Sequence, residues 1–329
     1  MNHKERVSAV LAGKAPDLLP VSSWGHDFLR EGSAEQLAAH TIERQKSFDY
    51  DFVKLNPRWT LFAEPWGNRY EPPTEQVFPR LVHKVVNQPS DLGALAAVSA
   101  NHPVFLEYER SLAMVLDEIG EELDVIATLF SPLACVGLLC GGVGAPLVGF
   151  AHSDARTLRH ALEQVTPVLR SLAERLIARG ASGVFYAPLQ WTSLDVCSAA
   201  FYEQFGRPYD MEVLAGVEEA HFNMLHVCGN HIEMQRFIEY PVQVLNWDNF
   251  GDGNPNLGEI HAKTDKVVAG GVPHRQLHKL DAPALRHVAA NAVGGLAERL
   301  MLTGGCAVGA QIGDDVRLSI ARLPAELAA

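Results

Sequence analysis

The chain has 329 residues, of which 47% are hydrophobic and 20% are charged, and its formal net charge is −12. This composition is typical of a soluble globular protein with a large core, and the negative charge argues against nucleic-acid and anionic-membrane partners. Five cysteines, an odd number at low density, argue against a disulfide framework and favour a reducing, cytoplasmic compartment.

Short apolar runs alternate with amphipathic helical stretches along the chain, after a polar start that lacks a signal-peptide core. Strands are predicted at residues 18–24, 50–56, 124–131, 183–187, 223–229, 243–248, 267–272 and 300–306. Helices are predicted at residues 101–119, 154–179, 198–220 and 282–299. Eight alternating units favour an α/β fold, a (β/α)8 TIM barrel forming a single domain over 1–329, with a doubly wound open sheet as the alternative.

The stretch 125–151 contains no charged residue and is long enough to span a bilayer. It contains Pro132, Pro146 and five glycines, which interrupt helices. We therefore expect a buried strand, a loop and a short apolar helix, and no membrane association.

The strongest chemical feature is the sequence Leu-His-Val-Cys-Gly-Asn at residues 225–230. Because strand side chains alternate with a period of two, His226 and Cys228 point the same way at the end of the fifth predicted strand. Cys306 ends the eighth strand, and barrel active sites lie where the strands end. One imidazole and two thiolates favour zinc over magnesium or calcium, with a position left for substrate. The alternative is a core histidine beside buried cysteines.

Two further residues after predicted strands are candidate catalytic groups. Asp248 ends the sixth strand and could be a fourth metal ligand, a helix N-cap or a substrate hydrogen-bond acceptor. His26 follows the first strand and could be a base, a substrate contact or simply a loop histidine.

Four residues are candidates for lining the substrate pocket. Lys54 and Arg58, near the end of the second strand, could hold a substrate carboxylate or form a solvated surface pair. Tyr186 and Gln190 lie at the end of the fourth strand, where Tyr186 is either a catalytic, pocket-lining group or a core aromatic.

Several segments resemble one known family. KERVSAVLAGKAPDLLPV at 4–21 resembles the N-terminus of uroporphyrinogen decarboxylase-like proteins, and FYEQFGRPY at 201–209 is similar to their segment ending in Pro-Tyr. Residues 225–230 and 304–306 resemble the metal motif of one branch of the superfamily. The resemblance covers most of the chain, is weakest over 60–120, and implies a barrel.

The superfamily contains two branches that catalyse different reactions, and the residues of this chain resemble those of one branch. True decarboxylases carry an arginine-rich segment like Met-Arg-Gln-Ala-Gly-Arg after the first strand, whereas this chain has SWGHDFLR at 23–30, with Arg30 as its one arginine. The corrinoid-dependent methyltransferases use a His-x-Cys and a distant Cys to hold zinc, as at His226, Cys228 and Cys306.

The resemblance therefore implies a zinc-dependent methyltransferase that moves a methyl group between a methyl-corrinoid and a small-molecule thiol. The corrinoid, such as a cobalamin, would arrive on a partner corrinoid protein. Two alternatives stay open: a decarboxylase-like lyase acting on a tetrapyrrole carboxylic acid, and a non-catalytic corrinoid or tetrapyrrole binder. The oligomeric state also stays open, with a homodimer as one alternative.

Overall fold

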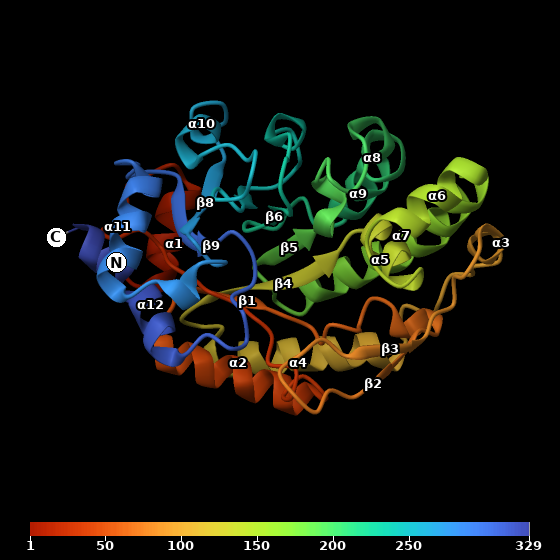
Figure 1. The fold of residues 1–329 in the computed structure, drawn as a ribbon. Helices are drawn as coiled ribbons and strands as arrows, with labels where there is room; N and C mark the ends of the chain where they lie inside the picture. The colour runs from red at the N-terminus through yellow and green to blue at the C-terminus, as the bar shows by residue number, and fades with distance from the viewer. Residues whose placement is uncertain (329) are drawn as a thin grey trace.

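A curled sheet of seven parallel strands lies at the centre of the computed structural model, which describes residues 1–328 (Figure 1). Its strands are β1 (Phe52–Leu55), β4 (Asp124–Phe130), β5 (Gly183–Ala187), β6 (Met224–Val227), β7 (Val244–Trp247), β8 (Val267–Val272) and β9 (Leu300–Gly304). Neighbours in the sheet follow this same order and every pair is parallel. The carboxyl ends of the strands therefore meet at one edge, where the candidate site residues lie.

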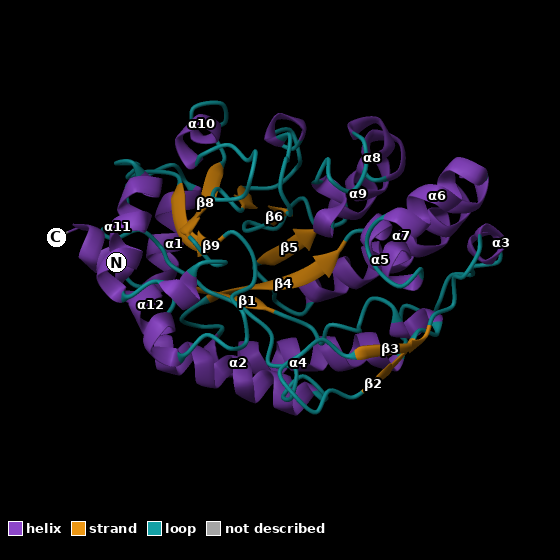
Figure 2. Cartoon of the chain, in the orientation of Figure 1, coloured by secondary structure: helices purple, strands orange, loops and turns teal. Residues whose placement is uncertain are grey.

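Helices surround the sheet on its outer side (Figure 2). They are α1 (His3–Leu11), α2 (Ala34–Phe48), α3 (Pro89–Gly93), α4 (Pro103–Ile119), α5 (Pro132–Leu139), α6 (Ala145–Ser153), α7 (Ala155–Ala178), α8 (Ala199–Phe205), α9 (Arg207–Leu214), α10 (Leu257–His261), α11 (Ala282–Val293) and α12 (Asp314–Ala328). Short 3-10 turns are η1 (Glu64–Trp66), η2 (Leu189–Thr192), η3 (Met234–Arg236) and η4 (Leu277–Lys279). Strands β4 to β9 are buried throughout, because the helices cover one face and inward side chains fill the other.

The expected closed barrel of eight strands is wrong: over residues 1–328 the sheet has seven strands and is an open, curled half-barrel of TIM-like type. The first predicted strand, 18–24, makes only one isolated bridge, between Val21 and Leu302 of β9. Pro20 offers a carbonyl to Leu302 but has no N–H to donate, so the ladder cannot extend toward the start of the segment.

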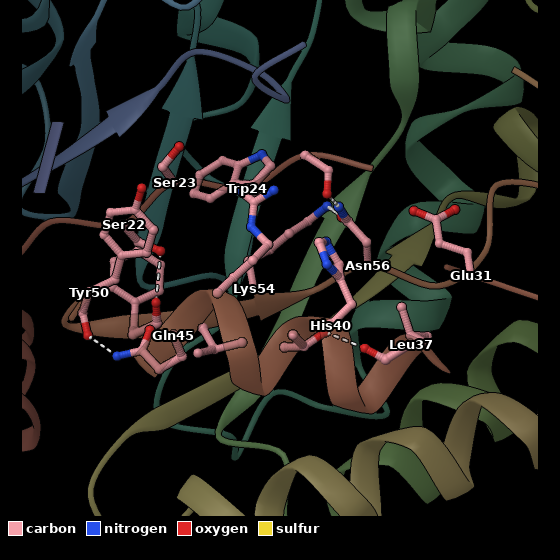
Figure 3. Close-up of a pocket in the computed structure, with 15 residues that line it drawn as sticks. Ser22, Ser23, Trp24, Glu31, Leu37, His40, Gln45, Tyr50, Lys54 and Asn56 are labelled. Carbon is pink, nitrogen blue, oxygen red and sulfur yellow. Dashed lines mark hydrogen bonds between the residues drawn. The ribbon is translucent and has the colours of Figure 1, made fainter. Parts of the chain in front are cut away.

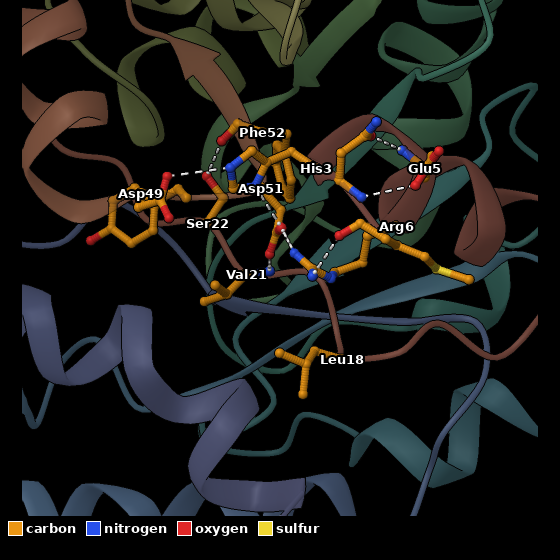
Figure 4. Close-up of polar contacts among 12 residues, drawn as sticks. His3, Glu5, Arg6, Leu18, Val21, Ser22, Asp49, Asp51 and Phe52 are labelled. Atoms are coloured by element: carbon orange, nitrogen blue, oxygen red, sulfur yellow. Dashed lines mark hydrogen bonds and ion pairs between the residues drawn. The ribbon is translucent and has the colours of Figure 1, made fainter.

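A side chain takes over part of the missing strand pairing (Figure 4). The Asp51 carboxylate, which directly precedes β1, accepts a hydrogen bond of 2.8 Å from the backbone N–H of Val21. The same carboxylate forms ion pairs with Arg6 and His3 of α1. Asp51 therefore links α1 to the segment around Val21 that lies between β9 and β1.

Two predicted helices are shorter than expected because of glycine and proline. The stretch 198–220 is divided into α8 and α9 at Gly206, where Pro208 in the first turn of α9 cannot continue a helix from before it. The stretch 282–299 ends at Val293, because Gly294 adopts a left-handed conformation with φ of 57° and caps α11.

Two segments contain more regular structure than the sequence predicts. The uncharged stretch 125–151 holds α5 between β4 and α6. Within 60–120, β2 (Arg69–Glu71) and β3 (Arg80–His83) form an antiparallel pair outside the main sheet (Figure 1). Among residues 1–328, no helix is both long and apolar enough to cross a membrane.

Candidate metal centre

Three side chains from two distant strands meet at the carboxyl edge of the sheet. His226 lies in β6, Cys228 follows that strand, and Cys306 follows β9. Their candidate ligand atoms all lie within 4.8 Å of one another, and His226 is buried while both cysteines are half-buried. The three ligand atoms thus lie together in the structure, with His226 and Cys228 on one strand end and Cys306 on another.

Glycine allows the chain to bring Cys306 to this position. A Cβ atom on Gly305 would lie 2.3 Å from the Cα atom of Asp248, so a residue with a side chain would collide with the backbone after β7. A Cβ atom on Gly304 would lie 2.7 Å from the carbonyl oxygen of Cys306 itself. The Gly-Gly pair is thus a steric requirement of the turn that presents the second cysteine.

A hydrogen bond from the neighbouring strand fixes the imidazole of His226. Asn246 pairs with His226 in the register of β6 and β7, and its Oδ1 lies 2.7 Å from His226 Nδ1. Its Nδ2 donates to the carbonyls of Ala269 and Gly304, which assigns Oδ1 as the acceptor. His226 therefore carries its proton on Nδ1, and Nε2 keeps its lone pair for a metal ion.

The two thiols influence each other directly. Hydrogen bonding from the Cys228 thiol holds the pKa of Cys306 well below its usual range, whereas the same contact and burial raise the pKa of Cys228. Thr192 fastens Cys228 from the other side, because its hydroxyl accepts from the Cys228 N–H at 2.9 Å and donates to the Cys228 carbonyl at 2.7 Å. Two sulfurs and one unprotonated imidazole nitrogen fit the donor preference of zinc.

Asp248 lies beside the trio and outside its ligand set. Its carboxylate is within 2.9 Å of Arg275 Nε and 3.9 Å of His274 Nδ1, and it accepts a hydrogen bond from the backbone of Phe250. No helix begins at Asp248, since α10 starts at Leu257 with Asn256 as its N-cap, so Asp248 closes a local turn and forms an ion pair with Arg275.

Among the predicted substrate-binding residues, Lys54 lies near the metal-ligand trio through an aromatic contact. Its ammonium donates to the Asn56 side chain (Figure 3). The same ammonium lies 4.4 Å from the ring centroid of Phe185. Phe185 in turn stacks on the imidazole of His226, with 5.1 Å between the ring centroids. Burial lowers the pKa of Lys54 to about 7, while the charge of Cys306 raises it. The ring of Phe185 therefore contacts both Lys54 and His226 of the metal-ligand trio, and we call this ring the aromatic wall.

Outside the ligand trio lie four other predicted residues: His26, Arg58, Gln190 and Tyr186. His26 pairs with Glu31 at 2.7 Å and contacts the rings of Phe28 and Trp59. The guanidinium of Arg58 is occupied by Glu64 and Glu107. Gln190 is exposed in η2.

Tyr186 is fully buried, and its hydroxyl donates to Asp210 of α9 at 2.8 Å. It faces the helix layer, since the side chain of its neighbour Phe185 occupies the inner face of β5. The structure therefore agrees with the core-aromatic alternative for this tyrosine.

Sequence reasoning overlooked Asn246 and His274. Asn246 is a polar residue inside the apolar run of β7, and a buried amide needs partners, so this signal could have been used. His274 follows β8 by two residues and is buried near Asp248, but its position after Pro273 resembles that of any loop histidine.

The family assignment follows from a match over most of the chain. The model of the uroporphyrinogen decarboxylase (URO-D) family matches residues 2–272. The chain belongs to the uroporphyrinogen decarboxylase family. This confirms the resemblance seen in the N-terminal and Pro-Tyr segments. No curated protein sequence matches the chain significantly.

Solved structures with similar folds include methyl-transferring enzymes. A methyltransferase from Methanosarcina mazei is 16% identical, covers 100% of both chains and superposes with a TM-score of 0.83. A B12-independent methionine synthase from Shewanella sp. W3-18-1, in complex with selenomethionine, is 13% identical over 95% of this chain and 94% of that one, with a TM-score of 0.62. At these identities the likeness concerns the fold, and the family and fold together indicate an enzyme.

Proposed function

We propose that this chain is a zinc-dependent methyltransferase that moves a methyl group between a methyl-corrinoid and a thiol acceptor. The observation that carries the proposal is the convergence of the ligand atoms of His226, Cys228 and Cys306 within 4.8 Å. The corrinoid is carried on a partner protein that docks at the mouth of the half-barrel, and residues 1–329 act as one catalytic domain.

The three ligands suit a catalytic zinc site better than a structural one. Structural zinc has four protein ligands, and here the further candidate carboxylate, that of Asp248, is paired with Arg275. Bound zinc would use its remaining position to hold the acceptor sulfur as a thiolate that stays nucleophilic at neutral pH.

The chain's own residues hold and orient the reacting groups. Asn246 keeps the Nδ1 proton on His226, and Thr192 fixes the backbone of Cys228. Phe185 covers the imidazole and excludes water from that side. Lys54, on the same aromatic wall, offers a positive charge to an acidic group of the acceptor.

Metal content tests the proposal first. Wild-type protein should hold about one zinc per chain, whereas Cys228→Ser and Cys306→Ser should each lose most of it, as measured by mass spectrometry of the metal. Cys197→Ser is the matched control, because Cys197 is a buried thiol outside the trio and donates a hydrogen bond to the Trp191 carbonyl.

Activity is then followed by the spectral change of methylcobalamin on addition of a thiol. The zinc-loaded wild type and Cys197→Ser should demethylate it, and the two ligand variants should not. Wild-type protein that binds no zinc, or ligand variants with full zinc content and activity, would refute the proposal.

A further inference from the structure

A second polar site lies between α2 and the loop that leads into α12. A cleft of about 220 Å³ has His40, Arg44 and Arg317 in its lining, and none of the three metal-ligand candidates lines it. A smaller cavity of about 40 Å³ shares His40 and Arg44 and continues to Lys54 and Asn56 (Figure 3). The cleft and the cavity together form a polar space along α2.

Arg317 is buried at the bottom of this space with part of its guanidinium unused. Only 3% of the residue is exposed. Its Nε and Nη2 donate to the carbonyls of Ile312 and Gly309, each at 3.1 Å, but Nη1 is buried and has no hydrogen-bond partner among residues 1–328. A buried charged donor without a partner is costly, which points to an occupant.

Arg44 contributes a second unpaired guanidinium to the same cleft. Its Nη2 is buried without a partner, and within the described part of the chain it forms no ion pair. Its nearest aromatic contact is Phe48, 5.9 Å from the guanidinium carbon. Nε2 of His40, and Ser23 and Gln45 in the adjoining cavity, also have buried polar atoms without partners.

The carboxylates around the cleft are engaged elsewhere or exposed. Glu43 pairs with Arg30 at 2.7 Å. Asp27 accepts from Gln76 at 2.7 Å and lies 3.5 Å from His40. Asp314, at the start of α12, is exposed. Two arginine charges, from α2 and α12, therefore face the cleft without a carboxylate contact.

From this arrangement we infer that the cleft binds a phosphate-type oxyanion, held by Arg44 and Arg317. Arginine guanidinium groups match the oxygens of phosphate in geometry, and a phosphate carries close to two negative charges at neutral pH. Ordered water would satisfy the orphaned hydrogen-bonding atoms, but it would supply no negative charge in direct contact with the two guanidinium groups, and Asp27 and Asp314 act on them only from a distance. The bound anion also links α2 to the loop at 309–312, which follows Cys306 in the chain.

Calorimetric titration of the full-length protein with inorganic phosphate tests the inference, with ionic strength held constant by sodium chloride. The wild type should bind one phosphate saturably, and Arg44→Gln should bind it at least about tenfold more weakly. Arg44 suits the test because its guanidinium makes no hydrogen bond within the described chain, so its replacement removes no hydrogen bond from the fold. Arg156→Gln, whose side chain is 88% exposed on α7, is the matched control and should bind like the wild type.

A parallel titration with glycerol 3-phosphate identifies the source of the anion. Tighter binding than that of inorganic phosphate assigns the site to a phosphomonoester, and equal binding assigns it to free phosphate. Absence of saturable binding of either compound by the wild type would overturn the inference, as would undiminished binding by Arg44→Gln. Neither measurement depends on zinc or on methyl transfer, so the outcome is independent of the proposed function.

Discussion

Asn246 and His226 face each other across β6 and β7, with 2.7 Å between Asn246 Oδ1 and His226 Nδ1. The amide is itself held by the carbonyls of Ala269 and Gly304, so it cannot turn to follow the ring. Through Gly304, the same amide contacts the strand that ends next to Cys306. One side chain thus connects the histidine and the second cysteine of the candidate metal centre.

Asn246→Leu, which keeps the approximate shape of the residue, should weaken zinc binding by about 10–100-fold because His226 loses its orienting partner. Competition with a chromophoric chelator measures the affinity. Unfolding in urea should show a loss of about 1–3 kcal/mol from the unpaired carbonyls. Asn291→Leu, at an exposed position of α11, should leave the affinity unchanged. Equal zinc affinity in wild type and a folded Asn246→Leu would show that the amide does not act on the metal centre.

Gly305→Ala should displace Cys306, because the added methyl group would lie 2.3 Å from the Cα atom of Asp248. Relief of this collision must move the 304–306 turn, so zinc content should fall below half and stability by about 1–3 kcal/mol. Gly149→Ala in α6 is the control, since its Cβ would meet nothing within 4 Å. Full zinc content in Gly305→Ala would mean that the turn tolerates the shift without moving the cysteine.

Lys54→Met keeps the aliphatic stem against Phe185 and removes the charge. Steady-state assays should show KM for 3-mercaptopropionate rising about tenfold, with KM for uncharged 2-mercaptoethanol unchanged. Arg58→Met provides a comparison, because that guanidinium is already paired with Glu64 and Glu107 and should not affect either KM. A similar rise in KM for both thiols would exclude a charge-specific contact.

Asp210 should make stability depend on pH. Burial raises its pKa to about 7, although the hydroxyls of Tyr186, Tyr202 and Tyr240 donate to it and Arg207 lies near. Because the folded state binds the proton more tightly, this stabilisation is complete below pH about 4 and is lost as pH rises toward 7. The loss is at most on the order of 4 kcal/mol, from about three pKa units at 1.36 kcal/mol each.

Asp210→Asn cannot titrate and should lack that component of the pH dependence. Urea unfolding of both proteins at pH 4 to 8 gives the comparison, and the wild type should lose more stability than the variant across this range. Parallel curves for the two proteins would place the pKa of the folded carboxyl near its ordinary value.

The sequence alone predicted the parts of the fold that depend on local patterns. Strands β5 and β8 have the expected bounds, since short apolar runs bounded by turns specify buried parallel strands. The meeting of Cys306 with His226 could be anticipated for a related reason, because parallel strands deliver their carboxyl ends to one edge.

Features that depend on contacts between distant segments could not be predicted in this way. The neighbours Phe185 and Tyr186 are both aromatic in a strand buried on both faces, so alternation does not say which faces the site. The partnership of Asn246 with His226 depends on strand register, and the engagement of Arg58 by Glu107 depends on where α4 packs.

The gap between β9 and β1 has a consequence for how the molecule fluctuates. The N–H of Val21 depends on the Asp51 carboxylate and that of Ser22 on a single β9 carbonyl, whereas β4 and β5 share a full ladder. Amide hydrogen exchange should therefore be faster at Val21 and Ser22 than in the interior strands. We expect the half-barrel to open first along this seam, with local unfolding starting at the N-terminal segment.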